Sequence, residues 1–214
     1  MLDLLIRSGE VIDGTGAARC RADVAVAGGR VVEVGGLPGA EARTVIDAAG
    51  CIVAPGFVDM HSHGDMTLPA LPTADGLVHQ GITSIVAGQC GDSLAPLLPE
   101  ARAQTIAWFH FPSIPVPWDE WSTFGSYLDY LTRLGTSVNV APLVGHGMIR
   151  SGAMGLKDAV ASRSELKCMV AEVERALDEG AIGLSTGLIY PPGGYTGTPE
   201  LVDLTWPVAR RGGL

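Results

Sequence analysis

The stretch CIVAPGFVDMHSHGDM, residues 51–66, marks the point where the character of the chain changes. Its first part is a near-continuous apolar run, which is typical of a strand buried on both faces of a parallel sheet. Runs of the same type recur at residues 82–88, 138–145 and 181–185. Segments of helical character separate these runs. We therefore predict βα units around a parallel sheet from residue 52 to residue 214.

Two of the intervening segments carry clear helix signals. In residues 162–180, Ser162 and Glu165 have capping-box spacing, and Gly180 supplies a C-terminal stop after an apolar stripe. A second helix is expected at residues 124–134, where Gly135 follows the last apolar position. The proline-rich stretch FPSIPVP, residues 111–117, predicts a rigid connecting loop.

The first fifty residues indicate a different kind of structure. Short segments such as ADVAVA and RVVEV alternate apolar and polar residues, and Gly28-Gly29 between them is a two-residue hairpin signal. Residues 44–50 add a further strand. We assign residues 1–51 to a small β-layer, which is too short to be expected to fold stably alone.

Composition narrows the class of protein. The chain has 214 residues, of which 47% are hydrophobic and 17% charged, as in a globular α/β protein. A net charge of -9 offers no basic surface for nucleic acid or an anionic membrane. Neither a signal-peptide pattern nor an uninterrupted apolar run of about 18 residues is present, so we expect a cytoplasmic protein. The four cysteines form no CxxC pair, which argues against a disulfide framework or a zinc finger.

His61 and His63 form the pair that most clearly indicates chemistry. Alternate residues of a strand point to the same side, roughly 7 Å apart, so both imidazoles could reach one metal ion. The pair also follows an apolar run, at the end of a strand where parallel α/β folds place their active sites. Structural histidines are the competing interpretation. The buried strand before the pair and the polar Gly-Asp after it favour metal ligands.

Cys90, in GQCGDS, stands at the corresponding end of the next predicted strand. A thiolate there would face the same crevice, and the flanking glycines indicate a backbone shaped around something. The alternative is a buried cysteine that acts as a small hydrophobe, and the residues alone leave both open. His146 ends a third strand in the same way and could contact substrate or bond the following loop. His79 and His110 are given structural roles, and core packing is expected for Cys20, Cys51 and Cys168.

These residues lie in blocks that resemble the amidohydrolase superfamily. The segments LLIRSGEVIDGTG, ADVAVAGGRVVEVG and VIDAAGCIVAPGFVDMHSH are similar to the entry into its barrel in many members. Three further blocks resemble the D-aminoacylase, or N-acyl-D-amino-acid deacylase, family in the same order: QGITSIVAGQCGDSLAPL, VNVAPLVGHGMIR and EGAIGLSTGLIYPPGGYTGTPEL. The resemblance extends over the whole chain.

The resemblance implies a metal-dependent (β/α)8 TIM barrel, a small β-sandwich built from both chain ends, and one or two Zn²⁺ ions. His61 and His63 match the HxH motif of the family. Cys90 matches its cysteine metal ligand, although GQCG stands here where GNCG is common. Tyr190 matches a position near the substrate. The implied reaction is amide hydrolysis of N-acyl-D-amino acids by an activated water whose proton an aspartate accepts.

The resemblance also implies parts that do not occur before Leu214, namely two later histidine ligands and the catalytic aspartate. We count about four of the eight strands that a barrel needs. We therefore expect the first half of a TIM barrel, residues 52–214, preceded by a β-sandwich portion, residues 1–51. Asp65 and Asp92 lie close to the predicted ligands, but neither matches the family's general base, and ordinary polar loop roles are favoured for both.

Two alternative functions follow. One is an inactive or partner-completed half-barrel fragment, which would associate with a second copy or with another protein because its sheet is open. The other is a cyclic-amide hydrolase of dihydroorotase or hydantoinase type. Those relatives generally use a carboxylated lysine, so Cys90 argues against them.

Overall fold

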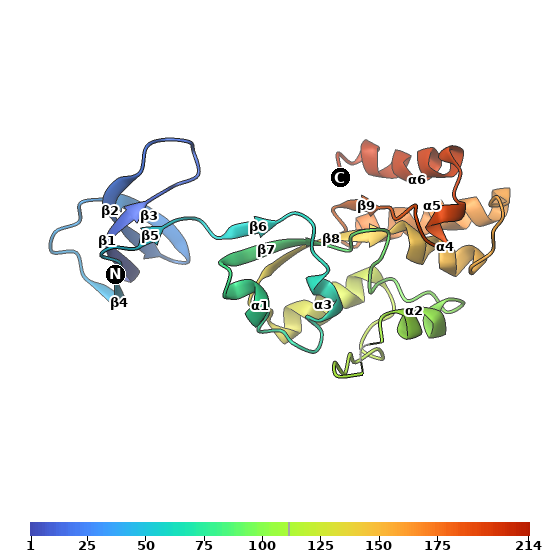
Figure 1. The fold of residues 1–214 in the computed structure, drawn as a ribbon, viewed down its shortest axis with the longest axis horizontal. Coiled ribbons are helices and arrows are strands. Elements are labelled where there is room, and N and C mark those ends of the chain that lie inside the picture. The colour runs from blue at the N-terminus through green and yellow to red at the C-terminus, as the bar shows by residue number, and fades with distance from the viewer. Residues whose placement is uncertain (111) are drawn as a thin grey trace. The chain divides into compact units, whose positions relative to one another are not determined.

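The computed structural model describes residues 1–110 and 112–214 and divides into two units, Met1–Gly56 and Phe57–Leu214. Figure 1 gives the order of their elements. Phe111, the first residue of the predicted loop at 111–117, lies outside the described residues. Within the described residues, no helix has both the length and the apolar character that crossing a membrane requires.

The first unit is a small sheet with strands in the order β3-β2-β1-β4, and β5 also pairs with β1. β2 is antiparallel to β1 and to β3, whereas β4 and β5 run parallel to β1. Ala27 pairs with Arg30 across the predicted two-residue turn, in which Gly28 and Gly29 have φ of 58° and 73°. The predicted hairpin is thus confirmed. The strands are β1 (Leu2–Val11), β2 (Cys20–Ala27), β3 (Arg30–Gly35), β4 (Ala42–Asp47) and β5 (Ile52–Val53).

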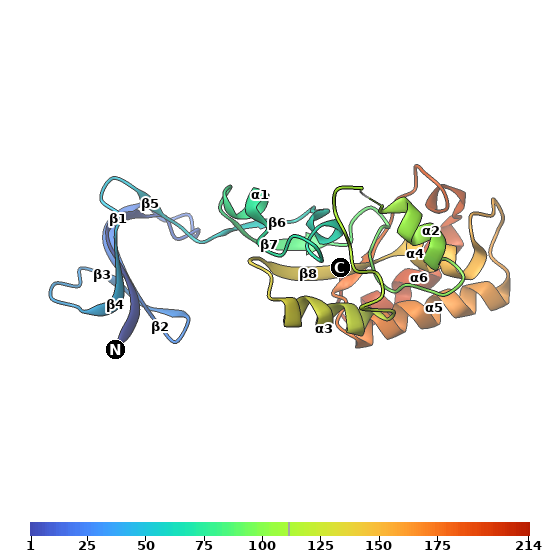
Figure 2. The same ribbon diagram turned by 90° about the horizontal axis from the view of Figure 1, so that it is seen from below.

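The second unit is built on a four-stranded sheet in the order β6-β7-β8-β9, and every pair is parallel. Sequential order with helices between the strands is the winding of a TIM barrel. Figure 2 shows α3 and α5 along the same side of β8. The strands are β6 (Phe57–Asp59), β7 (Ile82–Ala87), β8 (Asn139–Gly145) and β9 (Gly183–Ser185). The α-helices are α1 (Asp75–Val78), α2 (Arg102–Trp108), α3 (Phe124–Leu134), α4 (His146–Met154), α5 (Arg163–Asp178) and α6 (Thr198–Arg210), with 3₁₀ turns η1 (Gly64–Met66) and η2 (Gly193–Tyr195).

The two predicted helices are confirmed with their signals. Thr123 caps α3, Gly135 ends it with φ of 75°, and Ser162 and Glu165 form the predicted capping box of α5. The inward faces of α3 and α5 join the strands in one hydrophobic core. This core holds the ends of β7 and β8 in place, because Ile85, Ala87 and Val144 are buried in it.

Two expectations were wrong. The apolar run after Cys51 is not one buried strand: it breaks around Pro55 into β5 and β6, which belong to different sheets. β6 is an edge strand among the described residues, so Phe57 and Val58 are 63% and 57% exposed. The second error concerns three cysteines that were expected in the core. Cys20 and Cys51 instead lie at strand ends, and Cys168 lies beside the apolar stripe of α5. All three are exposed.

The last residues continue the sheet beyond β9. The Leu214 amide donates to the Ile182 carbonyl at 3.0 Å, and the Leu184 amide donates to the Leu214 carbonyl at 3.0 Å. One residue bonded to both neighbours of its partner is the pattern of a parallel ladder. The backbone at Leu214 therefore lies where a strand parallel to β9 would run.

Candidate metal centre

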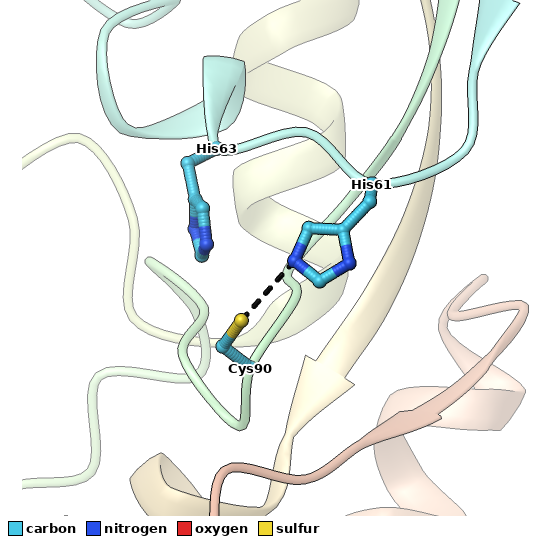
Figure 3. A group of neighbouring side chains, drawn as sticks. All are labelled: His61, His63 and Cys90. Atoms are coloured by element: carbon cyan, nitrogen blue, oxygen red, sulfur yellow. Dashed lines mark hydrogen bonds between the residues drawn. The ribbon is translucent and has the colours of Figure 1, made fainter.

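The two histidines follow the edge strand β6. The strand ends at Asp59, so neither histidine lies on it, and the expected strand alternation does not place them. Asp59 accepts a hydrogen bond from the His61 amide at 3.1 Å, and His63 precedes the turn η1. The two rings nevertheless lie close together in an edge-to-face arrangement, with centroids 5.8 Å apart (Figure 3). Local turns thus bring about the convergence.

Cys90 reaches the histidines from the turn after β7. Its Sγ lies 3.2 Å from the His61 Nε2, as Figure 3 shows. The backbone of Cys90 has φ of 59°, in the left-handed region that non-glycine residues rarely adopt. Gly88 and Gly91 on either side have φ of 73° and 76°. With positive φ at these three residues, the turn directs the Cys90 thiol toward the histidine pair (Figure 3).

Hydrogen bonds from neighbouring strands hold this turn. The Gly91 amide donates to the Ser185 hydroxyl at 3.0 Å, and that hydroxyl donates to the Gly88 carbonyl. A Cβ on Gly88 would lie 2.1 Å from the Leu143 carbonyl oxygen, so only glycine fits against β8 there. The turn is therefore fixed to both β8 and β9.

The three side chains fit a metal ion. One ligand atom from each of His61, His63 and Cys90 lies within 4.8 Å of the other two. Two imidazole nitrogens and a thiolate at such separations suit zinc, which binds nitrogen at about 2.0 Å and sulfur at about 2.3 Å. Partial burial, and then the neighbouring His61, lower the pKa of His63 and so favour the neutral ring that binds metals. Among the described residues, this is the group of three that could hold an ion.

The two nearby aspartates lie outside that group. Burial raises the pKa of Asp65 to about 7 and that of Asp92 to about 6. Asp92 Oδ2 lies 3.5 Å from the Tyr190 hydroxyl. Asp65 is 3% exposed, and its Oδ1 has no hydrogen-bond partner among the described residues. Both carboxyls face the interior around the turn.

Tyr190 lies in the segment between β9 and η2. Its hydroxyl donates to the Cys90 carbonyl, and its ring centroid is 6.4 Å from that of Trp108. Burial and the nearby Asp92 raise its pKa to about 12, so the phenol remains protonated at neutral pH. The predicted substrate residue therefore contacts the backbone of the predicted cysteine ligand.

His146 is the first residue of α4 and is completely buried. Its Nε2 lies 3.0 Å from Glu200 Oε1, and Glu200 also pairs with Arg150. The sequence reasoning missed both partners. Arg150 follows His146 by one helical turn, a signal that a helix prediction here would have revealed, whereas Glu200 lies far along the chain. His79 and His110 are exposed and outside the group, as expected.

A hollow of about 300 Å³ adjoins His61 and Cys90. Its wall includes Val86, Leu143 and Leu184 from β7, β8 and β9. Small-molecule sites have volumes of this order, with apolar walls and a few polar groups. The candidate ligands thus border a space large enough for part of a small molecule.

Comparison with known proteins agrees with this arrangement. Residues 44–193 match the family model described as the amidohydrolase family. An N-acyl-D-glutamate deacylase of Alcaligenes xylosoxydans xylosoxydans is 41% identical over 214 residues, which are 100% of this chain and 43% of that protein. A D-aminoacylase of the same organism is 36% identical over 220 residues, covering 99% of this chain and 43% of the relative.

A solved structure extends the comparison to the fold. It is an N-acyl-D-glutamate deacylase from Bordetella bronchiseptica, complexed with zinc and a phosphonate inhibitor. It has a TM-score of 0.88 and 38% identity, and the match covers 100% of this chain and 44% of that one. This chain thus spans less than half the length of these relatives, and the predicted barrel-type fold is confirmed. By the family match over most of its length, the chain belongs to the amidohydrolase family.

Proposed function

We propose that this chain contributes metal ligands to the site of a zinc-dependent amidohydrolase that cleaves N-acyl-D-amino acids into a carboxylate and a free D-amino acid. The convergence of His61, His63 and Cys90 is the observation that carries the proposal. Relatives named as D-aminoacylase and N-acyl-D-glutamate deacylase support the substrate class. When bound, zinc would polarise the amide carbonyl and make a water molecule more acidic.

The chain's own residues would then hold the zinc ion and orient the substrate. The histidines and the Cys90 thiolate fix the position of the ion at the mouth of the hollow. Tyr190 is proposed to lie on the substrate side of the site, where its ring would contact the substrate while its single hydroxyl hydrogen is donated to the Cys90 carbonyl. We assign His146 a supporting role instead of a direct substrate contact, because its ring has no exposed surface. The general base is predicted to be an aspartate of the family, beyond the positions matched by this chain.

The partner-completed half-barrel remains the second candidate. It is favoured by β6, which is an edge strand among the described residues. An unpaired strand edge is a template for pairing with another chain. In this case the chain would bind zinc but would require a partner for turnover.

Zinc titration by calorimetry tests the first proposal. We expect binding that His61→Ala, His63→Ala and Cys90→Ala each weaken strongly, while the matched control His79→Ala leaves it unchanged. Hydrolysis of N-acetyl-D-glutamate and N-acetyl-L-glutamate, with a hydantoin as the cyclic-amide control, tests the substrate class. Turnover by the chain alone that His61→Ala abolishes would exclude the inactive fragment, whereas a folded oligomer without turnover would support it.

A further inference from the structure

A buried ion pair lies behind the candidate metal centre. Arg150 has no exposed surface, and Glu200 is 7% exposed. Arg150 Nη1 pairs with Glu200 Oε2, and His146 Nε2 lies 3.0 Å from Glu200 Oε1. The other ion pairs of the described residues have at least one partner exposed to solvent. We call His146, Arg150 and Glu200 the Glu200 cluster. It differs from those surface ion pairs because its side chains are buried.

The Arg150 guanidinium joins several segments of the chain. Its Nε donates to the Pro192 carbonyl at 3.1 Å, and its Nη2 donates to the Ala159 carbonyl at 2.7 Å. Glu200 comes from the first turn of α6, and Arg150 from α4. A planar guanidinium is suited to this role because its donors are held in a fixed fork. The cluster therefore fixes the position of Pro192 relative to both helices.

From Pro192 the contacts continue to Cys90. Tyr190 is two residues away, and its hydroxyl donates to the Cys90 carbonyl. A Cβ on Gly187 would lie 2.0 Å from that same carbonyl oxygen, and one on Gly193 would lie 2.1 Å from the Gly187 carbonyl oxygen. The segment 187–193 is therefore folded tightly on itself and pressed against the backbone of Cys90.

Hydrophobic burial holds this segment only in part, because Pro192 is buried and Tyr190 is half-buried, whereas the two residues before Tyr190 face solvent. Ile189 is 93% exposed and Leu188 is 46% exposed. Cys90, for its part, has φ of 59°, a conformation that persists only where the surroundings impose it. The hydrogen bond of Tyr190 to the Cys90 carbonyl and the contacts of the Glu200 cluster with Pro192 therefore hold the segment, together with the burial of Pro192.

We propose that Arg150, Glu200 and His146 are positioning residues, which hold the Tyr190 segment against Cys90 and so keep the Cys90 thiol directed at His61 and His63. The inference rests on the proposed metal site. It goes beyond that site, because it gives the buried ion pair the role of fixing the orientation of the Cys90 ligand. A buried ion pair is in general weak support for stability, since the desolvation of two charges offsets their attraction.

The test uses the full chain with Cys90 as its single thiol, made by Cys20→Ser, Cys51→Ser and Cys168→Ser. These three cysteines are exposed and would otherwise also bind the probe. Co²⁺ is titrated, and both the dissociation constant and the thiolate-to-cobalt charge-transfer absorbance are recorded. Glu200→Gln, Tyr190→Phe and the double variant are compared with Val173→Ala, which removes core volume in α5 outside this chain of contacts.

We expect each single variant to weaken Co²⁺ binding by about tenfold or more, as losses of groups that orient metal ligands do. The charge-transfer absorbance per bound ion should fall as well. The double variant should be little worse than either single variant, because both act through the same contact at the Cys90 carbonyl. Val173→Ala should lower stability but leave both metal readouts unchanged. Parent-like cobalt binding in Glu200→Gln and Tyr190→Phe, or fully additive losses, would overturn the proposal.

A second readout separates this inference from the proposed function. The alkylation rate of the single Cys90 thiol by iodoacetamide is measured without metal, and release of the turn should raise it in both variants. If the parent chain binds no cobalt, the metal site fails, and alkylation alone decides the inference: unchanged rates overturn it. If Glu200→Gln does not fold, by circular dichroism, Arg150→Lys decides the inference by both readouts, because lysine keeps a positive charge near Glu200 but removes the guanidinium that bonds the Pro192 carbonyl.

Discussion

Replacement of Cys90 by glycine should make the second unit more stable than replacement by alanine, which is the reverse of the usual order. Cys90 has φ of 59°, and a side chain in the left-handed region costs about 1–2 kcal/mol. Glycine avoids that cost but loses about 0.5–1 kcal/mol through the greater freedom of the unfolded chain. The bond from the Tyr190 hydroxyl to the Cys90 carbonyl is retained in both variants. The expected net difference is therefore about 0.5–1 kcal/mol in favour of Cys90→Gly.

Urea unfolding followed by tryptophan fluorescence measures this difference. All four tryptophans, at positions 108, 118, 121 and 206, belong to the second unit, so the signal does not report on the first. A chelator is present throughout, so that metal binding does not contribute. Both variants should bind zinc equally poorly, because both lack the thiol. The φ of Cys90 indicates backbone strain at this residue. A Cys90→Gly variant that is no more stable than Cys90→Ala would contradict that strain.

Three further changes test other parts of the structure. Gly88→Ala should destabilise the second unit by more than about 2 kcal/mol in urea unfolding. The reason is that φ is 73° at this residue and the new Cβ would meet the Leu143 carbonyl oxygen. A near-neutral effect would contradict this packing. Ser162→Ala should cost about 1 kcal/mol in the same assay through loss of the α5 cap. Asp23 accepts hydrogen bonds from the Ser8 and Leu37 amides, which lower its pKa. Its stabilising effect on the first unit is thus present above its unfolded pKa and lost as the pH falls through its lower folded pKa. The protection factor of the Ser8 amide, which corrects its exchange rate for the intrinsic effect of pH, should therefore fall in acid, and Asp23→Asn should remove that fall.

Local patterns were sufficient to predict the elements that local forces determine. The helix α5 carries its cap, its apolar stripe and its stop within one segment, and the Gly28-Gly29 turn requires only two residues with positive φ. The run after Cys51 failed because hydropathy does not reveal which sheet a residue joins. Phe57 and Val58 are as apolar as buried strand residues, yet an edge strand leaves them exposed.

Prediction of the candidate site was likewise limited to residues that a local sequence pattern marks. The histidine pair and Cys90 were found because each follows an apolar strand, and parallel strands bring their ends to one edge. His146 was found in the same way, but its partners in the Glu200 cluster could not be. Arg150 and Glu200 are polar residues in helices, and only the packing of α6 against α5 and the turn at Pro192 brings Glu200 to Arg150.

The glycines around Cys90 explain why this turn requires support from elsewhere in the fold. Its close approach to β8 favours glycine and positive φ, which Gly88 and Gly91 adopt with little strain. A metal ligand must have a side chain, so Cys90 cannot be glycine and must adopt the same unfavourable region. Neighbouring groups then have to hold the residue there, as the Tyr190 hydroxyl does at the Cys90 carbonyl. Stability lost at the ligand is thus recovered through contacts outside the metal centre, which is why residues as distant as Glu200 are expected to affect how this chain binds a metal.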